Sequence, residues 1–225
     1  MMRLAPVLVL AAVAALTIPA LEAAAGADAT PAELAQALQR KYESIRDFST
    51  DFVHVYQGGV LKKQITERGR LLVKKPGKMR WEYMSPEEKL FVSDGVKVYS
   101  YIPQDKQVIV SSVPRDDQAT TPALFLAGKG NIARDYTPSF GQVPAGFPPG
   151  TRALKLVPKS RLTEYDWLLV VVDPMLAIRL LTTADAQGGQ STFSFANMKE
   201  NLGTSDNAFT FTIPRGVDVV SEGSR

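Results

Sequence analysis

The clearest alternation of apolar and polar positions lies between Lys78 and Met84. Met79, Trp81 and Tyr83 fall on one face of an extended segment, and the charged residues between them fall on the other. This period of two is typical of a half-buried β-strand. The pattern therefore predicts a strand with an aromatic face.

Turn residues divide residues 69–101 into four such strands. Pro76-Gly77 and Ser85-Pro86 are suited to connections, because proline presets φ and glycine permits positive φ. Asp94-Gly95 predicts a hairpin closed by a type I′ turn, in which both central residues have φ > 0.

Two segments have the pattern of helices. Thr30-Pro31-Ala32-Glu33 is a capping box with proline at the first helical position, and the following helix places Leu34, Leu38, Tyr42 and Ile45 on one stripe. Thr121-Pro122 begins a short apolar helix that includes Leu124, Phe125 and Leu126 and ends before Gly128. Another short helical turn is expected from Gly130 to about Arg134.

The remaining apolar segments predict strands. One begins at Phe48 with Phe52, His54 and Tyr56 on one side, and a second carries Leu61, Ile65, Leu71 and Val73 in phase. Further strands are expected at 96–102, 107–113, 152–157, 162–172, 177–184, 191–198 and 209–213. Many antiparallel strands with helices in two places predict a mainly β fold: one curved sheet, or an incomplete barrel, lidded by the N-terminal helix and the short internal helices.

The first 25 residues have the features of a signal peptide. Arg3 precedes an apolar run from Leu4 to Ile18, and Ala23-Ala24-Ala25 suits signal peptidase. The run is shorter than the ~20 residues that a membrane span needs. We therefore expect residues 1–25 to be removed and residues 26–225 to form one exported, soluble domain, with a retained anchor as the alternative.

Composition excludes several classes of function. The chain has no cysteine, so disulfides, thiol catalysis and cysteine metal sites are excluded. The net charge of +3 comes with no dense basic run, so no nucleic-acid partner is expected. No Gly-rich phosphate loop and no metal-binding motif occur, and we expect neither a cofactor nor a metal.

Catalytic groups are sparse. His54 is the one histidine and has no recognisable nucleophile as its partner, so a structural role is expected. Glu87-Glu88 and Asp116-Asp117 lie in polar, loop-like segments and are expected to be solvated. The sequence predicts a protein that is not an enzyme.

Several short motifs follow one another in a recognisable order over most of the chain after residue 25, including Thr121-Pro122 and the segment from Phe209 to Val217. Within residues 69–101 they consist of Gly69, Leu71, Val73, Lys74, Lys75, Pro76, Arg80, Trp81, Pro86, Val92, Ser93, Asp94, Gly95, Tyr99 and Tyr101. In this order the motifs resemble the family of outer-membrane lipoprotein carriers of the LolA type.

The resemblance implies a periplasmic monomer that shields the acyl chains of lipoproteins in a hydrophobic cavity between the inner and outer membranes. It also implies loading by an inner-membrane ABC transporter and delivery to an outer-membrane acceptor. The side chains expected to form the cavity wall are Leu71, Val73, Met79, Trp81, Tyr83, Val92, Leu124 and Phe125. Plain core packing is the alternative for the same apolar face.

The resemblance further implies that the residue before Pro76 holds the helical lid by hydrogen bonds. The family has arginine there, whereas this chain has Lys75, whose three donors lie on a point charge and not on a planar fork. Two other functions stay open: an envelope-stress sensor or regulator that binds lipid or peptide on the same fold, and a carrier of another lipid such as a glycolipid or isoprenoid.

Overall fold

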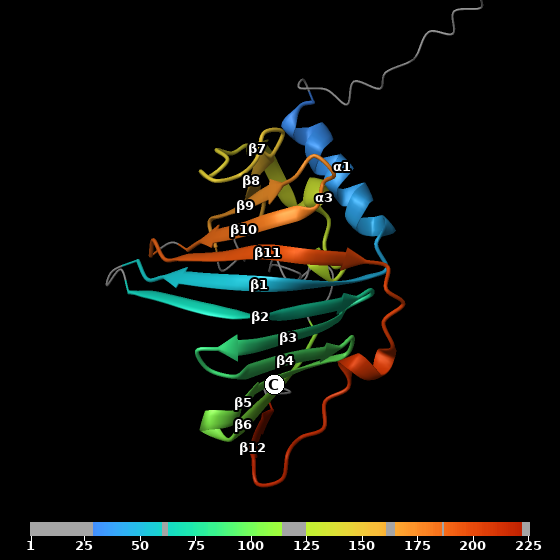
Figure 1. Ribbon diagram of the computed structural model, residues 1–225, viewed down its shortest axis with the longest axis vertical. Helices are drawn as coiled ribbons and strands as arrows, with labels where there is room; N and C mark the ends of the chain where they lie inside the picture. Colours follow the sequence, from blue (N-terminus) through green and yellow to red (C-terminus); the bar gives the residue numbers. More distant parts are fainter. Residues whose placement is uncertain (1–28, 60–62, 114–124, 161–164, 186, 222–225) are drawn as a thin grey trace, which may run out of the picture.

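A single twelve-stranded sheet forms the body of the computed structural model, which describes residues 29–59, 63–113, 125–160, 165–185 and 187–221. The spatial order of its strands is β12-β6-β5-β4-β3-β2-β1-β11-β10-β9-β8-β7 (Figure 1). The strands are β1 (Asp47–Gln57), β2 (Gln64–Lys74), β3 (Lys78–Ser85), β4 (Lys89–Asp94), β5 (Lys97–Ile102), β6 (Gln107–Ser112), β7 (Tyr136–Phe140), β8 (Arg152–Pro158), β9 (Trp167–Val172), β10 (Ile178–Ala184), β11 (Gln190–Glu200) and β12 (Asp218–Ser221).

The predicted fold class is confirmed: one open, curved sheet with few helices. Every neighbouring pair is antiparallel except β12 and β6, which pair in parallel. Register shifts at Ser49/Asp51, Arg68/Gly69 and Ile178/Leu180 interrupt three of the ladders. Such bulges bend a strand and increase its twist, so they account for part of the curvature.

Helix α1 (Pro31–Ser44) lies along the half of the sheet that contains β7 to β10 (Figure 1), and we call the face on which it packs the concave face. The predicted capping box is present: Thr30 accepts from the Glu33 amide, and Glu33 accepts from the Thr30 amide. Leu34, Leu38 and Tyr42 point into the core. The core residues beneath them come from both halves of the sheet, including Phe48, Leu71, Val73, Leu154, Leu156, Val170 and Ile178.

Helix α3 (Ile132–Asp135) contacts α1, and the Ile132 amide donates to the Gln39 side chain at 3.0 Å. It corresponds to the helical turn expected up to Arg134. A further helical turn is present at 125–126. Residues 1–25, Leu61, Asp116-Asp117 and residues 121–124, which carried predictions, lie outside the described residues. Within the described residues, no helix is both long and apolar enough to cross a membrane.

The expected strand at 209–213 does not form. Ser205 caps the 3₁₀ helix η3 (Asp206–Phe209), which lies against β3 and β4 instead of pairing with them. Phe209 is buried, and the Phe211 ring lies 5.5 Å from that of Tyr99. The apolar residues of this segment therefore cover the face opposite α1, and Figure 1 shows the segment continuing to β12.

The hairpin between β4 and β5 forms, but the predicted type I′ turn was wrong. Ser93 pairs with Val98, which leaves a four-residue loop. Within it Gly95 has positive φ and Asp94 does not. The Asp94 carboxylate instead accepts from the amides of Val96 and Lys97, both at 2.8 Å. An aspartate side chain that replaces a backbone acceptor in this way stabilises a longer turn.

Glycine is required where Phe52 crosses β2. Gly69 lies directly opposite Phe52, and a Cβ on Gly69 would meet the Glu82 carbonyl oxygen at 2.0 Å and the Phe52 ring at 2.6 Å. We expect Gly69→Ala to lower the free energy of unfolding by about 1–3 kcal/mol or more, because backbone and ring must both move. Urea unfolding at equilibrium measures this difference.

Gly58→Ala is the matched control. A Cβ there would lie 3.8 Å from its nearest neighbour, and the backbone is not left-handed. Alanine should then stabilise slightly, by about 0.4–1 kcal/mol, through the unfolded chain. If both substitutions changed the free energy of unfolding equally, the contact between Phe52 and Gly69 would not require glycine.

Candidate ligand-binding pocket

A pocket of about 490 Å³ opens on the concave face, beside the part that α1 covers. Its volume falls within the range of small-molecule sites, ~300–1,000 Å³. The residues that line it are Tyr56, Met79, Trp81, Tyr83, Phe91, Leu126, Tyr165, Leu181, Thr183, Asp185, Gly189, Ser191 and Phe193.

Aromatic side chains from neighbouring strands form the apolar wall. The Phe52 ring lies beneath them, 5.1 Å from the Trp81 ring and 4.9 Å from the Tyr83 ring, both edge to face. Phe193 on β11 lies 5.3 Å from Trp81. Edge-to-face arrangements are favourable for aromatic rings, so these contacts stabilise the wall.

Three of the predicted wall residues line the pocket, namely Met79, Trp81 and Tyr83. Leu71 and Val73 share their face, because they pair with Trp81 and Met79, but both are fully buried in the core. They support the wall and do not line the pocket.

Val92 does not belong to this wall. It pairs with Arg80 on β3, so its side chain lies on the face opposite Met79 and Trp81. The adjacent residue, Phe91, pairs with Trp81 and does line the pocket. The prediction that Val92 forms part of the cavity wall was therefore wrong by one position, and Phe91 takes its place.

The helical turn at 125–126 contributes Leu126 and not Phe125. Leu126 lines the pocket, whereas Phe125 packs against the Tyr42 ring of α1 with the ring centroids 5.6 Å apart. The turn thus touches both the pocket and the helix. The sequence predicted that this short helix covers the sheet, and its described part, residues 125–126, lies at the pocket.

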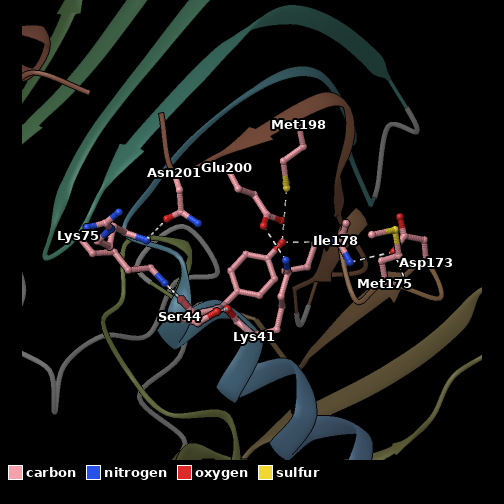
Figure 2. Close-up of polar contacts among 12 residues, drawn as sticks. Lys41, Ser44, Lys75, Asp173, Met175, Ile178, Met198, Glu200 and Asn201 are labelled. Atoms are coloured by element: carbon pink, nitrogen blue, oxygen red, sulfur yellow. Dashed lines mark hydrogen bonds and ion pairs between the residues drawn. The ribbon is translucent and has the colours of Figure 1, made fainter. Parts of the chain in front are cut away.

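Figure 2 shows Lys75 and Ile178 approaching α1 from opposite sides. Tyr42 on α1 links them to the 125–126 turn, because its ring contacts that of Phe125. Its hydroxyl accepts from the Ile178 amide at 3.1 Å, and its ring packs edge-on against Phe48. The Lys75 ammonium donates to the Tyr42 carbonyl and lies 5.7 Å from the centroid of its ring. Burial raises the pKa of the Tyr42 hydroxyl, so it stays protonated.

Lys75 therefore bonds to α1, and its methylene stem lies beside Gly128. A Cβ on Gly128 would meet the Lys75 Cδ at 2.9 Å. Gly77, two residues after Lys75, bonds to the same segment, since its amide donates to the Ala127 carbonyl at 2.9 Å. Burial lowers the pKa of Lys75 to about 8, although the carboxylate of Glu43 acts in the opposite direction.

The other end of the pocket is polar. Ser191 Oγ lies 2.8 Å from His54 Nε2, and His54 Nδ1 lies 3.0 Å from the Glu67 carboxylate. Lys89 donates to the other oxygen of that carboxylate at 2.6 Å. The four side chains lie on four strands of the sheet, and we call them the Ser191 network.

Charges fix the direction of the hydrogen bonds in the Ser191 network. Burial lowers the pKa of His54, although Glu67 acts against this. Burial acts to raise the pKa of Glu67, but the hydrogen bonds from Lys89 and His54 outweigh it and lower that pKa. The carboxylate therefore accepts from Nδ1–H of a neutral imidazole, and Nε2 accepts the Ser191 hydroxyl proton.

The order Ser191–His54–Glu67 is that of an acyl-transfer triad, but its surroundings do not suit catalysis. Ser191 lies within a strand, where it pairs with Tyr56 on one side and Thr183 on the other. Its main chain belongs to these ladders, whereas an oxyanion hole needs amide donors aimed at the reacting carbonyl. His54 also stacks flat on Phe193 at 4.1 Å, which fits a structural imidazole.

Sequence reasoning missed the pocket residues from β10, β11 and the turn between them. Phe193 and Phe195 do alternate with serine and threonine in the sequence, a signal that could have marked an aromatic face on the strand expected at 191–198. Nothing local places this strand beside β1. That pairing joins Phe193 to His54 and brings Ser191 into the pocket.

Comparisons with known proteins agree with this architecture. The sequence model of the family described as "Outer membrane lipoprotein carrier protein LolA" matches residues 43–212. The outer-membrane lipoprotein carrier protein of Chromohalobacter salexigens is 32% identical over 84% of this chain and 87% of its own length. That of Hahella chejuensis is 32% identical over 95% of this chain and 97% of its own length.

Among solved structures, an uncharacterised conserved protein from Thermus thermophilus aligns with 84% of this chain and 97% of its own chain. The TM-score is 0.50 and the identity 14%. At this identity the likeness concerns the fold alone.

The buried ammonium of Lys75 predicts a pH dependence of stability. Between its folded pKa of about 8 and the ordinary value of 10.5, the unfolded chain holds a proton that the folded chain has lost. The contribution of Lys75 to the free energy of unfolding should therefore rise with pH across this window. Urea unfolding of the wild type and Lys75→Met at pH 7, 8 and 9.5 measures it as a difference.

Lys97→Met serves as the control, because Lys97 is exposed. A difference for Lys75→Met that stays constant with pH would mean that Lys75 keeps its ordinary pKa in the folded protein.

Proposed function

Because this chain belongs to the LolA family of outer membrane lipoprotein carrier proteins, we propose that it carries acylated lipoproteins through the periplasm and shelters their acyl chains in the pocket. The observation that supports this most is the apolar wall of the pocket, which Met79, Trp81, Tyr83 and Phe193 form beside a well-packed core.

The chemistry of the wall suits hydrocarbon. Burial of a methylene group contributes ~0.8 kcal/mol, so about ten methylenes in the pocket would contribute ~8 kcal/mol before the costs of ordering. Trp81 and Tyr83 are rigid, and Met79 is flexible enough to adapt to chains of different shape. A wall of this kind binds by area and not by a particular group, as a carrier of many lipoproteins requires.

The opening of the pocket suits release. The sheet does not close into a barrel, and the pocket remains open to solvent although the adjacent core is fully buried. Leu126 lies on the short turn held by Gly77 and by the Tyr42 ring. Movement of this turn would change access to the wall while the ladders stay intact.

The wider pathway follows from the family. We propose that residues 1–25 are a signal peptide and that residues 26–225 form the periplasmic carrier domain. Loading would come from an inner-membrane ABC transporter, and delivery would go to an outer-membrane acceptor. We propose that the carrier acts as a monomer and by binding alone.

Export can be tested at the N-terminus. Arg3, the apolar run to Ile18 and Ala23-Ala24-Ala25 predict cleavage, so the secreted chain should begin near Gly26 or Asp28. Mass spectrometry of the purified intact protein gives this position. Recovery of only the uncleaved chain in the membrane fraction would contradict a shuttle that moves through the periplasm.

Met79→Glu tests whether the aromatic face is a binding site. Met79 is 8% exposed and lines the pocket, where a carboxylate can reach water but repels hydrocarbon. We expect the variant to keep the circular dichroism spectrum of the wild type and to lose at least about tenfold in affinity for an acyl chain. Displacement of N-phenyl-1-naphthylamine by palmitoyl lipids measures the affinity.

Met84→Glu is the matched control, because Met84 is exposed near the end of the same strand. It should bind as the wild type does. If Met79→Glu binds equally well, or if the wild type binds no acyl chain and co-purifies with none, the carrier proposal is wrong. Mass spectrometry of co-purified lipid also separates lipoprotein carriage from carriage of glycolipids or isoprenoids.

A further inference from the structure

The pocket has two chemically different ends. Met79 and Trp81 lie at one end of the strands that form the wall, and Leu126 contributes to the apolar lining. Further along the strands, Ser191 lies in register with Tyr56 and Thr183, and Asp185 and Gly189 follow in the adjoining turn. A ligand with a hydrocarbon tail and a polar group can match both ends in only one direction.

Ser191 offers an acceptor to this space. Its hydroxyl proton goes to His54 Nε2, because Glu67 holds the other imidazole nitrogen as the donor. Lys89 in turn neutralises Glu67. No donor among the described residues bonds to Ser191 Oγ, so its lone pairs are available to a ligand group that donates a hydrogen bond.

Asp185 adds a second acceptor and a negative charge. Its Oδ1 accepts from the amides of Gln187 at 2.9 Å and Gly189 at 2.7 Å, which fixes the carboxylate within the turn. A Cβ on Gly189 would meet Asp185 Oδ2 at 2.5 Å, so glycine makes room for this orientation. Asp185 is the charged residue among those that line the pocket in the described part of the chain.

We propose that Ser191 and Asp185 recognise the polar group at which an acyl chain begins, and that they select neutral groups with hydrogen-bond donors over carboxylates. Amides and hydroxyl-bearing glycerol esters belong to the first class, and free fatty acids to the second. This inference rests on the proposed function, since it presumes that the acyl chain occupies the apolar end.

The orientation follows from the same arrangement. The tail would lie along Trp81 and Met79, and the polar group would lie between β11 and the turn after β10. The network behind Ser191 also explains why a half-buried histidine and a buried glutamate lie on an otherwise aromatic face: they set the direction of the Ser191 hydroxyl. His54 and Glu67 are thus positioning residues, and Ser191 and Asp185 make the contacts.

Two probes with the same tail test the selection, namely 1-palmitoylglycerol and palmitate. The assay measures how each lipid displaces N-phenyl-1-naphthylamine from the purified protein, and each displacement curve gives a dissociation constant. The wild type should bind 1-palmitoylglycerol at least about tenfold more tightly, because palmitate places a second carboxylate near Asp185.

Substitutions separate the two contacts. Ser191→Ala should weaken binding of 1-palmitoylglycerol about three- to tenfold through the lost hydrogen bond. Asp185→Asn keeps Oδ1 for the turn and removes the charge, so it should strengthen binding of palmitate about tenfold and change 1-palmitoylglycerol little. Ser194→Ala is the control, because Ser194 is exposed on the opposite face of the same strand.

The outcomes distinguish this inference from the carrier proposal. If the dye binds, and both lipids displace it equally from the wild type and every variant, the inference is wrong and carriage stands. If neither the dye nor either lipid binds, the carrier proposal itself fails, and the inference falls with it. Release of palmitate from 1-palmitoylglycerol by the wild type but not by Ser191→Ala would overturn recognition in favour of hydrolysis.

Discussion

One helix has to cover the concave face of a twelve-stranded sheet. At ~4.8 Å between strands the sheet is about 53 Å wide, whereas the 14 residues of α1 span about 21 Å. Tyr42 secures the helix to the half of the sheet that it can reach, through Ile178 and Phe48. Among the described residues, no other helix of this length covers the rest of the concave face, and the pocket lies there.

The uncovered face is stabilised from within the sheet. Phe52 fills the gap above Gly69 and supports Trp81 and Tyr83, so the wall packs sideways across the strands. The Ser191 network continues this layer at the polar end, where Lys89 pairs with Glu67 and Ser191 bonds to His54. The face is therefore ordered without a second layer, which is the condition for a pocket that neither collapses nor unfolds when empty.

Local patterns predicted what depends on local chemistry. The alternation around Trp81 marked a strand face, and the capping box at Thr30 marked the start of α1. Val92 was misplaced because the phase of β4 against β3 depends on how the loop between them closes, and a slip of one residue exchanges the two faces. Ser191 and Asp185 were missed since only pairing with distant strands brings them beside Trp81.

The position of β1 governs when this protein can fold. It lies near the centre of the sheet between β2, which follows it directly, and β11, whose Glu200 pairs with Phe48. Asp47 also accepts from the amides of Leu202 and Gly203. The central ladder thus forms only after nearly the whole chain has emerged, and such non-local pairing is slow. Delayed closure would keep the newly made chain open for threading through a secretion channel, as the proposed export requires.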